Sequence, residues 1–89
     1  MKFATKSDMD KNSPEYHILS FLYAHRGKLV DLHNLEYFNN LSSEHKFLSV
    51  EYLLYKGYIT PCIERYIGHK HIGNTQITEA GVQRFLMYE

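Results

Sequence analysis

Hydrophobic residues recur at helical spacing along most of the chain, in blocks separated by polar residues and glycines. The first block predicts a helix from Pro14 to about Arg26. Ser13 can cap its first turn, and Pro14 lacks the backbone N–H that would need an acceptor there. Gly27 can adopt the left-handed conformation that ends a helix. The apolar side of this helix carries Ile18, Leu19, Leu22 and either Phe21 or Tyr23.

A second, shorter helix is predicted after an extended piece at residues 28–30. Asp31 can cap this helix, and the pair Asn39 and Asn40 can end it. The inward side of this helix is expected to carry Leu32, Leu35 and Phe38.

A third helix is predicted from a serine cap, either Ser42 or Ser43, to about Lys56. Gly57 follows and can end the helix in the left-handed conformation. The inward side of this helix is expected to carry Phe47, Val50, Leu53 and Leu54.

The last third of the chain predicts a hairpin and a closing helix. Residues 58–67 are rich in β-branched and aromatic residues, with Pro61 at an edge or bulge, and residues 74–77 can return as the partner strand. The tip between them is the basic segment 68–73. Thr78 can cap the last helix, whose apolar residues include Val82, packed on Ile77 as a hydrophobic staple, and then Phe85 and Leu86.

Two motifs carry a resemblance to a known family: Leu53-Leu54-Tyr55-Lys56-Gly57-Tyr58-Ile59 before the hairpin, and Ile77-Thr78-Glu79-Ala80-Gly81 after it. With the order of elements, they make the span from Pro14 to Tyr88 resemble small winged helix-turn-helix proteins. The expected fold class is α+β, mainly α: a three-helix core, a β-hairpin wing and a C-terminal helix. Residues 1–12 are expected to be a flexible arm, and residues 13–89 a single winged-helix domain.

The resemblance implies a function in DNA binding. In DNA-binding members the third helix enters the major groove and the wing touches the backbone or the minor groove. This implies a small DNA-binding protein, a transcriptional regulator, that reads duplex DNA with helix three (about 43–56) and the wing (about 65–73). The DNA-binding residues implied are Ser43, His45, Lys46, Ser49 and Tyr52 on the helix, and Arg65, His69, Lys70 and His71 on the wing.

The equal numbers of basic and acidic residues favour an alternative to DNA binding. Ten Lys and Arg face ten Asp and Glu, the formal net charge is zero, and helix three sets two lysines against two glutamates. No overall field therefore attracts a polyanion. The alternative is a protein–protein interaction module that does not bind DNA, such as an adaptor, a phage-type protein or a homodimer. Its contact residues would be the tyrosines that the predicted core does not need: Tyr16, Tyr37, Tyr52, Tyr55 and Tyr66.

Other chemistry finds little support in the sequence. His69 and His71 with Cys62 lack the paired spacing of structural zinc sites, and Cys62 lies in an apolar strand where a thiol is usually inert. There is no phosphate-binding loop, dinucleotide motif or nucleophile motif. We therefore expect no enzyme activity, no cofactor and no metal. A single cysteine and the lack of an apolar leader or membrane-spanning run predict a cytoplasmic protein that does not bind membranes.

Overall fold

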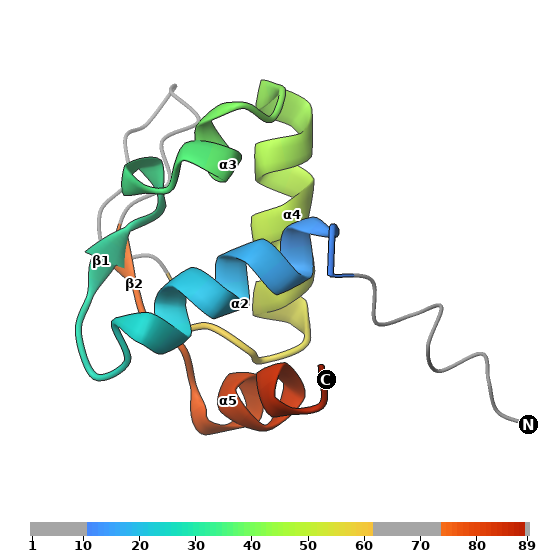
Figure 1. Ribbon diagram of the computed structural model, residues 1–89. Helices are drawn as coiled ribbons and strands as arrows, with labels where there is room; N and C mark the ends of the chain where they lie inside the picture. Colours follow the sequence, from blue (N-terminus) through green and yellow to red (C-terminus); the bar gives the residue numbers. More distant parts are fainter. Residues whose placement is uncertain (1–10, 62–73, 89) are drawn as a thin grey trace, which may run out of the picture.

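Helix α2 (Pro14–Ala24) is the central helix of the fold and contacts α3, α4 and α5 (Figure 1). The structure is a computed structural model, and it describes residues 11–61 and 74–88. The hydroxyl of Ser13 accepts the amide of Tyr16, so the predicted cap is confirmed. The helix ends two residues before the expected Arg26, and Gly27 then takes a φ of +88°.

The predicted second helix is divided into two short pieces. A 3-10 helix, η1 (Leu32–Asn34), is followed by the α-helix α3 (Glu36–Asn39), because Leu35 between them is extended. Asp31 caps the first piece as predicted, accepting the amide of His33 at 2.9 Å. Leu32 and Phe38 are fully buried as expected, whereas Leu35 is only half-buried.

Helix α4 (Ser43–Tyr55) is capped by Ser42, whose hydroxyl accepts the amide of His45, and Gly57 follows two residues after its end with a φ of +77°. Val50 and Leu53 are buried as predicted. The prediction that Phe47 points inward is wrong, because its side chain is 42% exposed. At 3.6 residues per turn, position 47 lies about a quarter turn from the line through the two buried residues.

The described strands form one antiparallel pair. Strand β1 (Val30–Asp31) pairs with β2 (Asn74–Thr75), with Val30 opposite Thr75. The chain after β2 continues beside residues 58–60, where Ile59 and Ile77 form an antiparallel bridge. The predicted pairing of the two hairpin segments is thus seen at their base. Residues 62–73, which include the rest of the predicted wing, lie outside the described residues.

Helix α5 (Glu79–Leu86) closes the domain across α2 (Figure 1). The hydroxyl of Thr78 accepts the amide of Gly81, which confirms the predicted cap, and donates to the carbonyl of Gly57 at 2.6 Å. The described residues thus form a small, mainly helical α+β domain of four α-helices and one two-stranded sheet, compatible with a winged-helix layout. Its core consists of Ile18, Leu19, Leu22, Leu32, Phe38, Val50, Leu53, Ile59 and Ile77.

Candidate functional site

The solvent side of α4 combines large apolar side chains with carboxylates. Tyr55 is 86% exposed and Leu48 is 51% exposed, and the two lie seven residues apart, about two helical turns. Globular proteins expose single apolar residues freely, but a contiguous group on one element is a common mark of a binding surface. We call this surface the α4 face, and it consists of Glu44, Phe47, Leu48, Glu51, Tyr52 and Tyr55.

The residues expected to read DNA from the third helix do not all share this face. Ser43, His45 and Tyr52 are exposed, but Ser49 and Lys46 are half-buried. The ammonium of Lys46 lies 5.8 Å from the centre of the Phe38 ring on α3, a cation–π contact, and thus on the side of α4 that packs on the domain. The wing residues expected to touch DNA, Arg65, His69, Lys70 and His71, lie outside the described residues.

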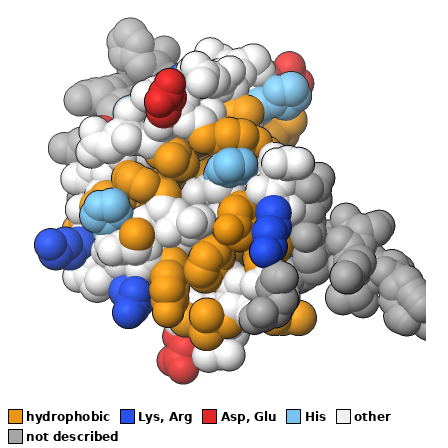
Figure 2. Space-filling model, viewed as in Figure 1, with side chains coloured by type: hydrophobic (Ala, Val, Ile, Leu, Met, Phe, Trp, Pro, Cys, Tyr) orange, Lys and Arg blue, Asp and Glu red, His pale blue; other side chains and the backbone are white. Residues whose placement is uncertain are grey.

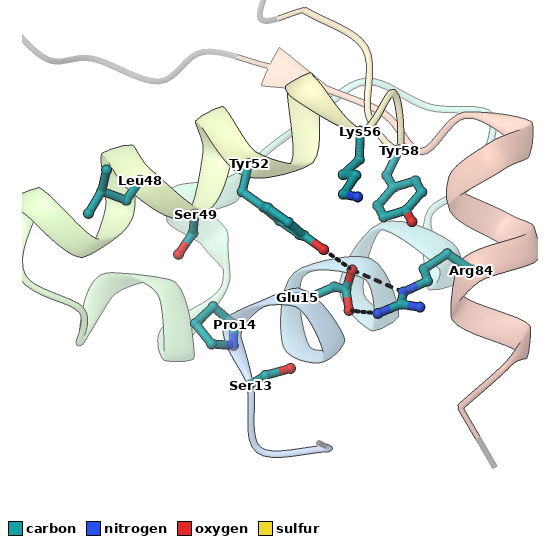
Figure 3. A pocket seen from close by; sticks show the side chains of 9 residues that line it. All are labelled: Ser13, Pro14, Glu15, Leu48, Ser49, Tyr52, Lys56, Tyr58 and Arg84. Carbon is teal, nitrogen blue, oxygen red and sulfur yellow. Dashed lines mark hydrogen bonds and ion pairs between the residues drawn. The ribbon is translucent and has the colours of Figure 1, made fainter. Parts of the chain in front are cut away.

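A groove of about 560 Å³ lies beside the α4 face, between the start of α2, the second half of α4 and α5 (Figure 3). It brings together residues that are far apart in the sequence. Two of the residues expected to read DNA, Ser49 and Tyr52, are on its wall. The full lining is Ser13, Pro14, Glu15, Leu48, Ser49, Tyr52, Lys56, Tyr58 and Arg84.

The carboxylate of Glu15 is the common acceptor for Arg84, Tyr52 and Tyr88, and we call these four residues the Glu15 cluster. Arg84 donates to it from Nε at 3.1 Å and from Nη2 at 3.0 Å, which is the two-point geometry that a guanidinium forms with a carboxylate. The hydroxyl of Tyr52 donates to Oε2 at 3.4 Å, and that of Tyr88 donates to Oε1. Both carboxylate oxygens therefore accept hydrogen bonds, and the Glu15 cluster joins α2, α4 and α5.

Burial and these contacts raise the pKa values of both phenols in the Glu15 cluster. Burial, followed by the hydrogen bond to Glu15, raises the pKa of Tyr88 to about 12. Burial and the charge of Glu15 also raise the pKa of Tyr52, and the hydrogen bond to Glu15 raises the pKa of Arg84. Glu15 and Arg84 form an ion pair, so their charges cancel within the cluster.

Lys56 and Tyr58 extend from the end of α4 and the residues after it into the same groove (Figure 3). The ammonium of Lys56 lies 5.9 Å from the centre of the Tyr52 ring. Within residues 11–61 and 74–88, this ammonium pairs with no carboxylate, and the hydroxyl of Tyr58 makes no hydrogen bond. The groove therefore holds one cation that no neighbouring anion balances.

Two of the tyrosines expected at an interface pack within the chain instead. The ring of Tyr37 stacks on His17, with 3.9 Å between the ring centroids. The ring of Tyr16 packs against Phe85 and Tyr88, with centroid distances of 5.8 and 5.0 Å. Figure 2 shows hydrophobic side chains, with histidines among them, gathered on the side of the molecule where α2 lies in front. Of the other three expected tyrosines, Tyr52 and Tyr55 belong to the α4 face, and Tyr66 lies outside the described residues.

Comparisons with known proteins, and a check of the described residues for metal sites and membrane-spanning helices, add no candidate to the α4 face and the groove. No family model, curated protein or solved structure matches the chain. In the part of the chain that the structure describes, no three His, Cys, Asp or Glu side chains gather as a metal site would require. The candidate ligands Cys62, His69 and His71 lie outside that part. None of its helices has both the length and the apolar character needed to cross a bilayer.

Proposed function

We propose that this protein is a winged-helix domain that binds a protein partner through the α4 face. The observation that carries the proposal is the composition of that face, where four large apolar or aromatic side chains are exposed beside two carboxylates. The partner surface would be apolar with basic residues around it.

The order and pairing of elements support the winged-helix part of the proposal. A helix, a short strand, a short helical region and a longer helix come first, followed by the paired segments and a closing helix. The strand after the first helix pairs with the strand before the last helix, and residues 58–60 pair on with residues 76–78. This is the arrangement expected of a three-helix core with the base of a wing.

The side chains of the α4 face suit a protein better than a nucleic acid. Tyrosine offers contact area with little loss of side-chain entropy and keeps a hydroxyl for hydrogen bonding, which explains its enrichment at interfaces. Glu44 and Glu51 would repel phosphates, whereas they would steer a basic surface into place. Lys46, the cation nearest the middle of the helix, is occupied with the Phe38 ring.

A second candidate function is DNA binding by the same helix, as a transcriptional regulator. The observation that favours it is that α4 keeps one side open in a layout where DNA-binding members insert the corresponding helix into the major groove. The cations of the expected wing, Arg65 and Lys70, would then supply phosphate contacts, with binding that weakens steeply as salt is raised.

One experiment separates the two functions. The amide signals of the full chain are followed by NMR during titration with a short mixed-sequence DNA duplex at low salt, and with an amphipathic helical peptide of leucine and lysine. We expect the peptide, and not the duplex, to shift the amides of residues 44–55. Duplex shifts confined to α4, with none from the peptide, would establish the second candidate, and no shift there from either probe would refute both.

Charge-removing variants make the test specific to the α4 face. Glu44→Gln and Glu51→Gln are each expected to weaken peptide binding by up to about fivefold, the range of an exposed ion pair. Glu79→Gln on α5 removes the same charge from an exposed position outside the face and is expected to leave binding unchanged. Equal weakening by all three variants would mean that the peptide senses only the overall charge.

A further inference from the structure

We propose that the groove between the start of α2, the second half of α4 and α5 binds a small organic acid, a monocarboxylate on an apolar or aromatic body. The groove shares Leu48 and Tyr52 with the α4 face. The groups proposed to hold the anion, Lys56 and Tyr58, lie outside that face, so the test does not depend on the partner proposed above. Three observations carry the inference: the charge balance of the groove, the polar groups directed into it and its apolar wall.

The charged side chains that line the groove carry one net positive charge. Glu15 and Arg84 cancel each other through their two-point contact. Lys56 is then the remaining charged residue of the lining, and no carboxylate of the described residues lies within ion-pair distance of its ammonium. The first turn of α2 also opens on the groove, and its partial positive charge adds to the attraction for an anion.

A single negative charge fits this balance best. A carboxylate would neutralise Lys56 and leave the groove without net charge. A phosphate monoester carries roughly 1.5–2 negative charges at neutral pH and would leave part of its charge unmatched. On charge balance, the groove therefore favours the monoanion.

Free donors are available for the two carboxylate oxygens. Lys56 and Tyr58 both point into the groove in Figure 3, and the ammonium and the phenol are both donors. Nη1 of Arg84 makes no hydrogen bond within the described residues, because Glu15 is held by Nε and Nη2. The hydroxyl of Ser49, about two helical turns before Lys56 on α4, is a fourth polar group of the lining.

The body of the ligand would lie against apolar surface. Pro14 and Leu48 line one end of the groove, and the ring of Tyr52 extends across it (Figure 3). A volume of about 560 Å³ lies within the range of small-molecule sites, roughly 300–1,000 Å³, where a few placed polar groups orient an otherwise apolar ligand. A flat aromatic acid meets both requirements, since its ring can pack beside Tyr52 while its carboxylate reaches Lys56.

The test uses benzoate as the probe and benzamide as its neutral counterpart of the same shape. Both are titrated into the full chain, and amide shifts are followed by NMR. We expect benzoate to shift Ser49, Tyr52, Lys56, Tyr58 and Arg84 with a saturable response, and benzamide to have little effect. No response to benzoate, or an equal response to the two probes, would overturn the proposal.

Two variants assign the carboxylate to its donors. Lys56→Gln is expected to weaken benzoate binding at least about tenfold, because it removes a charged hydrogen bond, and Tyr58→Phe by about threefold to tenfold. Lys28→Gln, at an exposed position outside the groove lining, is the matched control and should bind as the parent does. Unfolding midpoints of all three variants check that the fold is retained. Unchanged affinity in Lys56→Gln would place the anion elsewhere and refute the site.

Discussion

Arg84, near the end of α5, holds the carboxylate of Glu15, in the first turn of α2, by two hydrogen bonds of 3.0 and 3.1 Å. The two residues are 69 positions apart, and the side chains of both are largely buried, 9% exposed for Glu15 and 20% for Arg84. Tyr52 brings α4 into the same cluster. The cluster thus fixes three helices relative to one another at the edge of the core.

Replacing Glu15 with Gln should destabilise the domain by about 2–3 kcal/mol, because it leaves a largely buried guanidinium without its counter-charge. The amide of glutamine also cannot accept all four hydrogen bonds at once. Urea unfolding followed by circular dichroism measures the change. Glu79→Gln, an exposed carboxylate at the start of α5, should cost less than about 0.5 kcal/mol. Equal midpoints for the two variants would mean that the Glu15–Arg84 pair contributes nothing net.

The phenol of Tyr88 should make the domain lose stability at alkaline pH. Its pKa is raised from 10.0 to about 12 by burial and by the hydrogen bond to Glu15, so the folded state holds the proton more tightly than the unfolded chain does. The stabilisation is complete below about pH 10 and is lost as the pH rises from about 10 to about 12. Tyr52, whose pKa is also raised, acts in the same direction.

Urea unfolding of the parent and of Tyr88→Phe at a series of alkaline pH values tests this linkage. The free energy of unfolding should fall less steeply with pH in the variant, because only the Tyr52 part of the effect remains. Tyr55→Phe, at a position that is 86% exposed, is the control and should follow the parent. Parallel pH curves for the parent and Tyr88→Phe would show that Tyr88 has an ordinary pKa in the folded state.

Gly81→Ala should destabilise the domain although alanine is the better helix former. An added Cβ would meet the carbonyl oxygen of Tyr58 and would lie 2.7 Å from Cγ1 of Ile77. Alanine gains about 1 kcal/mol of helix propensity over glycine, but overpacking against a backbone carbonyl costs more, and we expect a net loss of about 1–2 kcal/mol. Gln83→Ala, at an exposed position of the same helix, should not destabilise. Thermal unfolding of both variants measures the difference, and a stabilised Gly81→Ala would contradict the contact.

Local signals in the sequence predicted the helix ends well. The caps at Ser13 and Thr78 and the left-handed glycines at 27 and 57 are confirmed, because a cap or a stop depends on a few neighbouring residues. The break in the second helix was not predicted, since the extended conformation of Leu35 has no local marker. Pairing of β1 with β2 was not predicted either, because it joins segments more than 40 residues apart.

The candidate sites were harder to predict than the helix ends. Helix α4 has apolar or aromatic residues on most sides, so spacing alone does not choose its inward side, and Phe47 was assigned to the wrong one. Exposure of Tyr52 and Tyr55 could be predicted, since the core did not need them. The groove and the Glu15 cluster could not, because nothing in the sequence near Glu15 indicates a partner in the last helix.

The two leucines of α4 that differ most in burial give a direct test of how this helix is oriented. Leu53 is fully buried, and Leu48 is 51% exposed on the α4 face. Leu53→Ala should cost about 2–5 kcal/mol, since it opens a cavity in the core, whereas Leu48→Ala should cost less than about 1 kcal/mol. Urea unfolding of the two variants measures both changes. Because the substitution and the helix are the same, intrinsic helix propensity cancels, and similar losses would mean that α4 is rotated from the orientation on which the α4 face depends.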